Sequence, residues 1–485
     1  MSAPLWTSLK MEEATGGRAL RPFEVSGISI DTRTLQKGDL FVALADARDG
    51  HDFVADALAK GAAGALVNRC PPGVDKSSPL LVVTDVFEAL QALAVAARAR
   101  THARIVAVTG SVGKTGTKDM LHTMLVAQGR THSATASFNN HWGVPLTLAR
   151  MPRTTEFAVI EIGMNAPGEI APLARMARPH VALITTVAPV HIEVFDDLAG
   201  IAQEKASIVE GLDPGGVAVL NRDTSTIAIQ RRRARRQGAR IVTFGSVGRP
   251  AFRLREAELT PGATLVEARA DGHPMLFRIG APGRHLALNA LGALAAVEAL
   301  GADIGKAALA LSQWNNPDGR GTRWVLDLGE GGIDGSVLLI DDAFNASPTS
   351  VEVSLAGLGA TKPKDGIGRV SKGRRIVFLT DMLELGRHAR AMHEGLSELP
   401  AWSGIDKVYA AGPMMQHLHA ALPPGKRGKW FKTPQEMAAQ AGRLIDAGDV
   451  VLVKGSKGSK ASLTVTALKK LGATRPAKQP DDGDD

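Results

Sequence analysis

The chain has 485 residues and a net charge of +8, with 44% hydrophobic and 22% charged residues, a composition typical of soluble globular proteins of about three domains. Cys70 is the only cysteine, which excludes an internal disulfide framework and favours a reducing compartment. Neither a signal peptide nor an apolar run of about 18 residues is evident, so we expect a cytoplasmic protein without membrane insertion.

The N-terminal segment, residues 1–102, alternates short strands and helices, as expected of a small α/β domain. Ser29, Asp31 and Arg33 alternate along one predicted strand, so their side chains should share one face. A polar triplet that includes an arginine can hold a diphosphate or a uracil. An exposed edge strand explains the same pattern equally well.

The most informative stretch begins with a buried strand at residues 105–108, followed by TGSVGKT and a helical pattern. Strand, glycine loop, Lys-Thr and helix is the context of a phosphate-binding loop, although this loop is shorter than the general consensus. An ordinary glycine-rich turn is the alternative. The lysine can reach the outer phosphates, and the threonine hydroxyl can ligate Mg²⁺. The residues predicted to bind nucleotide here are Gly110, Ser111, Val112, Gly113, Lys114, Thr115 and Gly116.

Five further residues of the central segment, residues 103–313, bear on its chemistry. The loop amides of Asn139 and Asn140 can position a phosphate or a substrate carboxylate. Glu161 lies near the end of a buried strand, where it must be paired or ligate a metal, and we favour a metal. His191, just past the next strand, is either structural or a ligand. Lys205, in the middle of a predicted helix, is interpreted from position alone as a surface residue.

Much of the positive charge lies in one arginine run, residues 231–233 with 235 and 236. It is typical of the solvated face of a helix between Thr226 and Gly238. Because no aromatic residues interleave with the run, we expect no nucleic acid partner. Shorter alternating runs at residues 263–268 and 274–279 then predict antiparallel strands.

The C-terminal segment, residues 314–474, again alternates strands with helices, which predicts a second doubly wound, Rossmann-like sheet. Arg320 lies in a turn near its start. Asp341 and Asn345 belong to the polar cluster DDAFNASPTS at the end of a strand. A later basic turn, KGSKGS, suits an anion. Residues 475–485 are rich in Pro and Asp and are predicted to be disordered.

Together these motifs resemble the Mur ligases over essentially the whole chain except the C-terminal tail. The general signals are TGSVGKTGTK, the Glu161 strand, His191, Lys205 and the Arg320 turn. DDAFNASPTS, TDMLELG and VLVKGSKGS resemble the member that adds a dipeptide. The departures are Gly116, Ala343-Phe344 and Ser347, which affect nucleotide stacking and dipeptide contacts but not the reaction type.

The resemblance implies three domains: an N-terminal domain that binds a UDP-linked substrate, a central P-loop-type domain that binds ATP, and a C-terminal Rossmann-like ligase domain. It implies an ATP-dependent amide ligase of peptidoglycan synthesis. Such an enzyme forms an acyl phosphate on UDP-N-acetylmuramoyl-tripeptide and joins it to D-alanyl-D-alanine. We expect a monomer. The alternative is another amide ligase of the superfamily, of a different muramoyl-peptide type or of the folylpolyglutamate type.

The same resemblance implies roles for individual residues. Thr115, Glu161 and His191 are expected around Mg²⁺. Lys205 matches a lysine that is carbamylated in relatives and then ligates a second Mg²⁺, which would overturn the surface interpretation. The implied catalytic residues are thus Lys114, Glu161, His191 and Lys205. The implied binding residues are Ser29, Asp31 and Arg33 for UDP, Asn289 for adenine, and Arg320, Asp341 and Asn345 for the nucleotide and the dipeptide.

Overall fold

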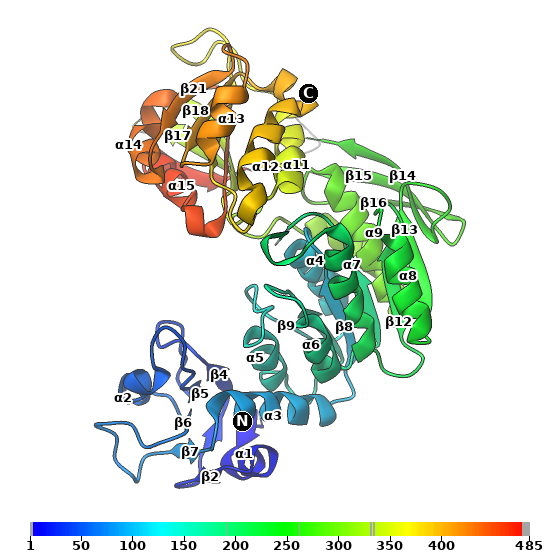
Figure 1. Ribbon diagram of the computed structural model, residues 1–485, viewed down its shortest axis with the longest axis vertical. Coiled ribbons are helices and arrows are strands. Elements are labelled where there is room, and N and C mark those ends of the chain that lie inside the picture. Colours follow the sequence, from blue (N-terminus) through cyan, green and yellow to red (C-terminus); the bar gives the residue numbers. More distant parts are fainter. Residues whose placement is uncertain (1–2, 191, 261, 330–331, 333–334, 478–485) are drawn as a thin grey trace.

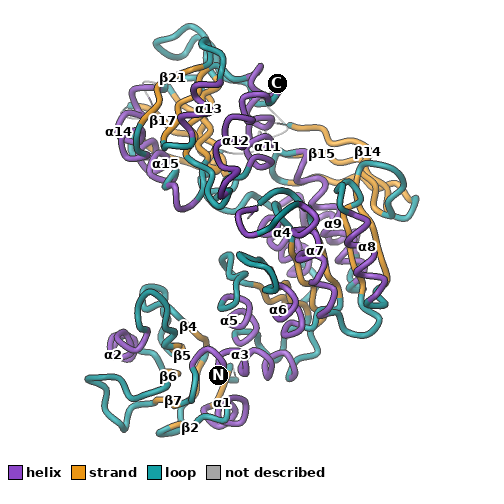
Figure 2. The backbone as a smooth tube through the Cα atoms, viewed as in Figure 1, coloured by secondary structure: helices purple, strands orange, loops and turns teal. Residues whose placement is uncertain are grey.

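The computed structural model describes residues 3–477, apart from residues 191, 261, 330–331 and 333–334 (Figure 1). The chain forms three lobes that follow one another in sequence, each built on a β-sheet with flanking helices (Figures 1 and 2). The predicted α/β class is therefore confirmed. Within the described part of the chain, no helix combines the length and apolarity needed to cross a membrane.

The N-terminal lobe contains a five-stranded sheet in the order β2-β7-β6-β5-β4. Strands β4 to β7 pair in parallel and are largely buried, as short apolar parallel strands usually are. The elements are β1 (Trp6–Thr7), α1 (Ser8–Thr15), β2 (Arg18–Ala19), β3 (Glu24–Val25), β4 (Gly27–Ser29), β5 (Asp39–Val42), α2 (Val54–Ala59), β6 (Gly64–Val67), β7 (Leu80–Val82) and α3 (Val86–Ala99).

Helix α5 (Gly143–Ala149) completes the N-terminal core, although it follows the glycine loop in sequence. Its Leu146 and Ala149 belong to the same buried cluster as residues of β4 and α3. Trp6 Nε1 donates a hydrogen bond to the Ala149 carbonyl at 2.9 Å. The guanidinium of Arg100 lies 3.6 Å from the Trp6 ring centroid. This core contains residues from both sides of position 102, so a domain boundary near residue 102 remains a proposal.

The central lobe has a nine-stranded sheet in the order β16-β15-β14-β13-β12-β11-β8-β10-β9. Strands β8 to β14 pair in parallel. Strands β14 to β16 are antiparallel, which confirms the prediction for β15 and β16. The elements are β8 (Arg104–Thr109), α4 (Lys114–Val126), β9 (Thr131–Ser133), β10 (Phe157–Glu161), α6 (Ile170–Ala177), β11 (Val181–Ile184), α7 (Leu198–Ala206), β12 (Val217–Asn221), α8 (Ile227–Arg236), β13 (Arg240–Gly245), β14 (Phe252–Leu259), β15 (Thr264–Ala270), β16 (His273–Ile279), α9 (Arg284–Ala299) and α10 (Ile304–Ala310).

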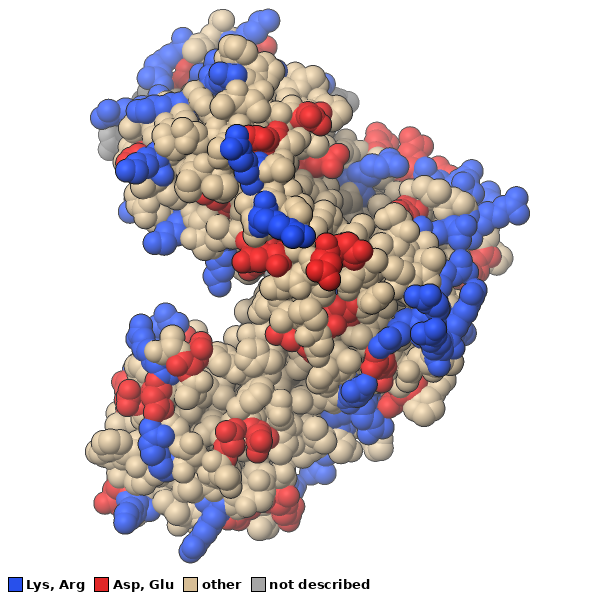
Figure 3. Space-filling model, viewed as in Figure 1, with Lys and Arg blue, Asp and Glu red and all other residues tan. Residues whose placement is uncertain are grey.

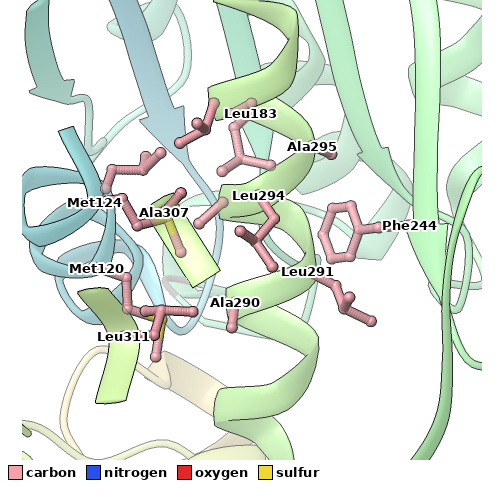
Figure 4. Close-up of a cluster of buried hydrophobic side chains, with 14 of the residues drawn as sticks. Met120, Met124, Leu183, Phe244, Ala290, Leu291, Leu294, Ala295, Ala307 and Leu311 are labelled. Carbon is pink, nitrogen blue, oxygen red and sulfur yellow. The ribbon is translucent and has the colours of Figure 1, made fainter. Parts of the chain in front are cut away.

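Helices cover both faces of the parallel part of this sheet. Helices α4, α9 and α10 pack on one face, and α5, α6, α7 and α8 pack on the other. Figure 4 shows the first layer, where Met120 and Met124 of α4 approach Leu291 and Leu294 of α9. All four side chains are fully buried. Replacing Leu294 by alanine should therefore destabilise the lobe by roughly 2–5 kcal/mol.

The C-terminal lobe has a seven-stranded sheet in the order β21-β20-β19-β22-β18-β17-β23. Strands β18 to β22 form its parallel part, and β17 pairs antiparallel with β18 and β23. The elements are β17 (Thr322–Leu328), β18 (Ser336–Asp342), α11 (Pro348–Gly359), β19 (Arg375–Thr380), α12 (Ala389–Gly395), β20 (Lys407–Ala411), α13 (Met415–Ala421), β21 (Arg427–Phe431), α14 (Pro434–Leu444), β22 (Val450–Lys454), α15 (Ser462–Lys469) and β23 (Gly472–Pro476).

We predicted that residues 475–485 are disordered, and this was wrong for Arg475 and Pro476. Arg475 and Pro476 belong to β23, which pairs with β17. The Arg475 guanidinium also forms an ion pair with Asp327, 3.2 Å away. Composition suggested disorder, but these contacts order the two residues. A proline is tolerated because β23 is an edge strand. The rest of the predicted tail, residues 478–485, lies outside the described residues.

Candidate active site

The loop between β8 and α4 has the backbone of a phosphate-binding turn. A Cβ atom on Gly110 would lie 1.9 Å from Thr185 Oγ1, so only glycine fits there. Gly113 has φ 88° and begins α4 in a left-handed conformation. A Cβ atom on Gly113 would lie 2.9 Å from Asn289 Nδ2, so the predicted adenine residue lies against the loop. The N-terminus of α4 adds its positive dipole end.

Lys114 folds back over this loop. Its Nζ donates to the Gly110 carbonyl at 2.7 Å. Burial lowers the pKa of the ammonium group, the nearby Glu161 carboxylate opposes the shift, and Arg320 adds to it. A phosphate oxygen would be a stronger, charged partner than the carbonyl. The lysine is therefore placed to release the Gly110 carbonyl and bind a phosphate oxygen in its place.

Glu161 lies beside the loop because β10 pairs with β8 in register, which sets Glu161 against Val108. Its Oε1 accepts hydrogen bonds from Thr115 Oγ1 at 3.2 Å and from Asn139 Nδ2 at 2.6 Å. Its Oε2 is buried and has no hydrogen-bond partner in the described part of the chain. Such an orphaned carboxylate oxygen is costly, and a bound cation would satisfy it.

The residues present fit Mg²⁺ bound with a nucleotide. The described residues contain no group of three or more His, Cys, Asp or Glu side chains that could hold a metal ion. Mg²⁺ commonly needs only one or two protein oxygens, because water and phosphate oxygens complete its shell. Glu161 and Thr115 supply two such oxygens. The predicted ligand His191 lies outside the described residues.

The interpretation of Lys205 as a surface residue was wrong. Lys205 is 1% exposed, on the face of α7 that packs with Ile201 against the central sheet. No described residue forms a hydrogen bond or an ion pair with its Nζ. Burial, together with the charge of Lys114, lowers the pKa of this amine well below its usual value, and Glu204 opposes the shift. The amine is therefore held toward its neutral, nucleophilic form.

Arg320 reaches from the C-terminal lobe to the nucleotide loop. One guanidinium nitrogen donates to Ser137 Oγ at 3.2 Å, and Ser137 Oγ lies 3.2 Å from Thr115 Oγ1. The guanidinium also lies 4.0 Å from the ring centroid of Phe344. Burial lowers its pKa, whereas Glu161 raises it. Ser137 was not predicted, since one hydroxyl in a polar loop gives no signal of its own.

Asp341 and Asn345 lie at the carboxyl end of β18, as predicted. Burial raises the pKa of the Asp341 carboxyl group. The neighbouring Asp342 forms an ion pair with Lys454 Nζ at 2.7 Å, and this amine also donates to the Asn345 carbonyl at 3.0 Å. The first lysine of the predicted anion-binding turn is therefore already paired within the protein.

The predicted strand that carries Ser29, Asp31 and Arg33 ends at Ser29. Ser29 is buried, and its Oγ donates to the Asp31 carbonyl. Asp31 accepts hydrogen bonds from the backbone and side chain of Arg33, and the side-chain bond is the main cause that lowers the Asp31 pKa to about 2. The prediction that the three side chains share one strand face was wrong, because these turn contacts bend the chain after Ser29. Binding of UDP by the three residues stays a prediction.

The side chains of Asn139 and Asn140 make different contacts. Asn139 supports Glu161, as described above. Asn140 Oδ1 accepts from the Gly143 backbone N–H at 2.9 Å. That bond helps α5 to begin at Gly143.

Comparisons with known proteins agree with this arrangement. Residues 108–297 match the Mur ligase middle domain, and residues 330–457 match the glutamate ligase domain of Mur ligases. The chain is 32% identical over 440 residues to the UDP-N-acetylmuramoyl-tripeptide–D-alanyl-D-alanine ligase of Bacillus subtilis (strain 168), covering 90% of this chain and 91% of that relative.

Solved structures share the fold over nearly the full length. A crystal structure of MurF from Acinetobacter baumannii superposes with a TM-score of 0.81 at 28% identity, covering 96% of this chain and 99% of that one. MurF ligase from Thermotoga maritima, in complex with ADP, superposes with a TM-score of 0.73 at 25% identity, covering 92% and 97%.

Proposed function

The chain belongs to the Mur ligase family, and from that membership and its site we propose that it joins D-alanyl-D-alanine to UDP-N-acetylmuramoyl-tripeptide in an ATP-driven reaction. The supporting observation is one continuous set of contacts. Arg320 reaches Ser137, Ser137 reaches Thr115 of the glycine loop, and Thr115 bonds to Glu161. This set brings side chains of two lobes to one phosphate-binding loop.

The reaction needs activation because a carboxylate does not condense with an amine in water. The terminal carboxylate of the tripeptide attacks the γ-phosphorus of ATP, the bond to the β-phosphate oxygen breaks, and an acyl phosphate and ADP result. The amine of D-alanyl-D-alanine then attacks the acyl carbon, loses a proton, and phosphate leaves. Lys114 and Arg320 would stabilise the negative charge on the transferring group.

Mg²⁺ is the proposed cofactor of this step. Thr115 and Glu161 would hold it, with His191 as the further ligand that the family resemblance implies. When bound, the cation supplies charge neutralisation to the phosphates. Asn139 orients the Glu161 carboxylate, and the glycine loop with the N-terminus of α4 fixes the phosphate chain.

Lys205 is proposed to act as a carbamate. Its neutral amine would attack the carbon of CO₂ and lose a proton, giving an anionic carboxylate in a buried site. The low pKa of this amine and its lack of a described partner support the proposal. The carbamate would be a second anionic ligand near the phosphates.

Further parts of the proposal concern the substrates. Ser29, Asp31 and Arg33 would bind the UDP end, and Asp341 and Asn345 would approach the nucleotide and the dipeptide. The enzyme would work in the cytoplasm as a monomer. Boundaries near residues 102 and 313 would separate the three domains.

The test is phosphate release from ATP with purified protein. We expect release only when both UDP-N-acetylmuramoyl-tripeptide and D-alanyl-D-alanine are present. Equal release with neither substrate, or release with glutamate and a folate instead, would contradict the proposal. Replacing D-alanyl-D-alanine by D-alanine or by L-alanyl-L-alanine gives matched controls.

A further inference from the structure

The central lobe carries an excess of arginine that the ligase site does not use. Residues 222–284 contain thirteen arginines, no lysine and five acidic residues, which gives this segment a net charge of +8. The whole chain has the same net charge of +8. The rest of the protein is therefore neutral overall, and the excess positive charge belongs to one region.

Two structural features place these arginines on one side of the central sheet. Helix α8 packs on the face that also carries α6 and α7. Strands β14 to β16 turn residues such as Leu254 and Val266 toward α9 on the opposite face. Because side chains alternate along a strand, Arg269 and Leu276 point to the α8 side, where they are exposed. Arg255 lies at a register shift between Leu254 and Glu256 and is exposed as well. Figure 3 shows Lys and Arg side chains gathered over this part of the molecule.

We call these exposed residues the arginine surface: Arg232, Arg235, Arg236, Arg249, Arg255 and Arg269. Exposed acidic side chains on the same strands, Glu256, Glu258 and Glu267, offset part of its charge, and the segment as a whole keeps its net charge of +8. Glu210, the acidic partner of Arg233, is shared with Arg175. On the sheet, Arg253 lies directly opposite Arg269. Like charges in such register destabilise a sheet, so fold stability does not explain the arrangement.

Aliphatic side chains are exposed within the same region. Leu276 is 80% exposed and Val247 is 65% exposed. The aromatic residues of the segment, Phe244, Phe252 and Phe277, are all buried. Proteins that bind single-stranded nucleic acid stack bases on exposed aromatic rings, which this surface does not offer. Arginines beside exposed aliphatic side chains instead suit the headgroup region of an anionic bilayer.

We propose that the arginine surface binds the anionic headgroups of a membrane, with Leu276 and Val247 entering the interfacial layer. The guanidinium groups match lipid phosphates with paired N–H donors. The attachment is peripheral and reversible. It uses none of the residues assigned to ATP or to the ligase substrates, so it stands independently of the proposed reaction.

Sedimentation of the full chain with vesicles tests the proposal. We expect binding to phosphatidylcholine vesicles that contain phosphatidylglycerol, and little binding to phosphatidylcholine alone. The triple variant Arg235→Gln, Arg255→Gln, Arg269→Gln should lose on the order of 100-fold in partition coefficient, about fivefold for each arginine. Leu276→Ser should lose severalfold. Raising the salt concentration should release the wild-type protein.

A second triple variant serves as the charge-matched control. Lys10→Gln, Lys76→Gln, Lys470→Gln removes the same charge from exposed positions elsewhere. It should bind anionic vesicles like the wild type, and both triple variants should keep full ligase activity in solution. Equal loss of binding in both variants would show general charge attraction and overturn the proposal. So would binding to a single-stranded oligonucleotide without binding to anionic vesicles.

Discussion

Two lysines lie at or just beyond the carboxyl ends of parallel strands in two different sheets, and their amines have different partners. Lys114 follows β8 and Lys454 ends β22, each next to a glycine-containing turn. Among the described residues, the Lys114 amine bonds only to a carbonyl of its own loop. The Lys454 amine is paired with Asp342 and with the Asn345 carbonyl. A glycine-lysine signal thus marks an anion site only where no internal carboxylate has already engaged the lysine.

The helices that follow the two turns differ in the same sense. Lys114 begins α4, which has 13 residues and directs free backbone N–H groups at the loop. Lys454 is followed by a three-residue turn, Lys457–Ser459. Helix α4 therefore adds an anion-binding end to the loop at Lys114, and the turn at Lys454 does not. We expect catalysis to depend on the first lysine and stability on the second.

The largest expected effect is that of Lys114→Ala. Loss of its charge from the phosphate site should lower kcat/KM by roughly 10³-fold or more. The melting temperature should stay close to that of the wild type, because the one hydrogen bond that Lys114 Nζ forms with a described residue is to the Gly110 carbonyl. Steady-state kinetics and thermal unfolding measure both quantities. A variant with near wild-type kcat/KM would break the distinction between the two lysines.

Lys205 extends the comparison to a buried lysine whose amine has no partner among the described residues. Lys205→Ala should lower kcat by roughly 10²–10³-fold, and added bicarbonate should not restore it. Wild-type activity in this variant would remove the carbamate proposal.

The stability of a Lys205 variant should move in the opposite direction. Lys205→Met should be more stable than the wild type in buffer free of CO₂ and nucleotide, because it removes an amine that burial disfavours when charged. The unfolded lysine binds its proton more tightly than the folded one, so wild-type stability rises with pH up to the unfolded pKa of about 10.4. The advantage of methionine should therefore be largest near neutral pH and shrink toward alkaline pH. Urea unfolding at several pH values measures it.

Lys454→Met should mainly affect folding. It leaves Asp342 without its charged partner, although Asp342 is 18% exposed and still accepts a hydrogen bond from Ser354. Breaking this partly buried pair should cost at most roughly 3–5 kcal/mol in free energy of unfolding. The double variant with Asp342→Asn should recover much of that loss, as a double-mutant cycle would show. Unchanged stability in the single variant would mean that the ion pair of Lys454 with Asp342 does not stabilise the fold.

The smallest expected effect is that of Ser137→Ala. It removes the hydroxyl between Thr115 and Arg320, a loss of about 1 kcal/mol, or roughly fivefold in kcat/KM. Ser312→Ala, on an exposed 3₁₀ turn away from the loop, is the matched control. If both variants behave alike, the Ser137 contact does not support catalysis.

Local pattern was sufficient for part of the site. The strand, glycine loop and helix at Lys114 were visible in the sequence, as was the carboxylate of Glu161 at a strand end. Lys205 also carried a signal. It lies four residues after Ile201 and three before Ile208, which places it on the buried face of its helix. The general tendency of lysines to be exposed outweighed that spacing.

Contacts between lobes could not be predicted in this way. The approach of Arg320 to Ser137 joins residues 183 positions apart. It depends on how the C-terminal lobe sits on the central one, and no local periodicity encodes that. The turn at Asp31 was missed for a related reason, since side-chain hydrogen bonds of Asp31 overrode the alternation of its neighbours.

The packing of α5 into the N-terminal core bears on how the chain folds during synthesis. Leu146 and Ala149 fill a core whose other members precede the glycine loop. On the ribosome, the first hundred residues will therefore emerge with that core incomplete, and Trp6 will lack its acceptor on Ala149. The lobe can close only once α5 has left the exit tunnel. The N-terminal lobe therefore completes its folding only after the nucleotide loop and α5 have been translated.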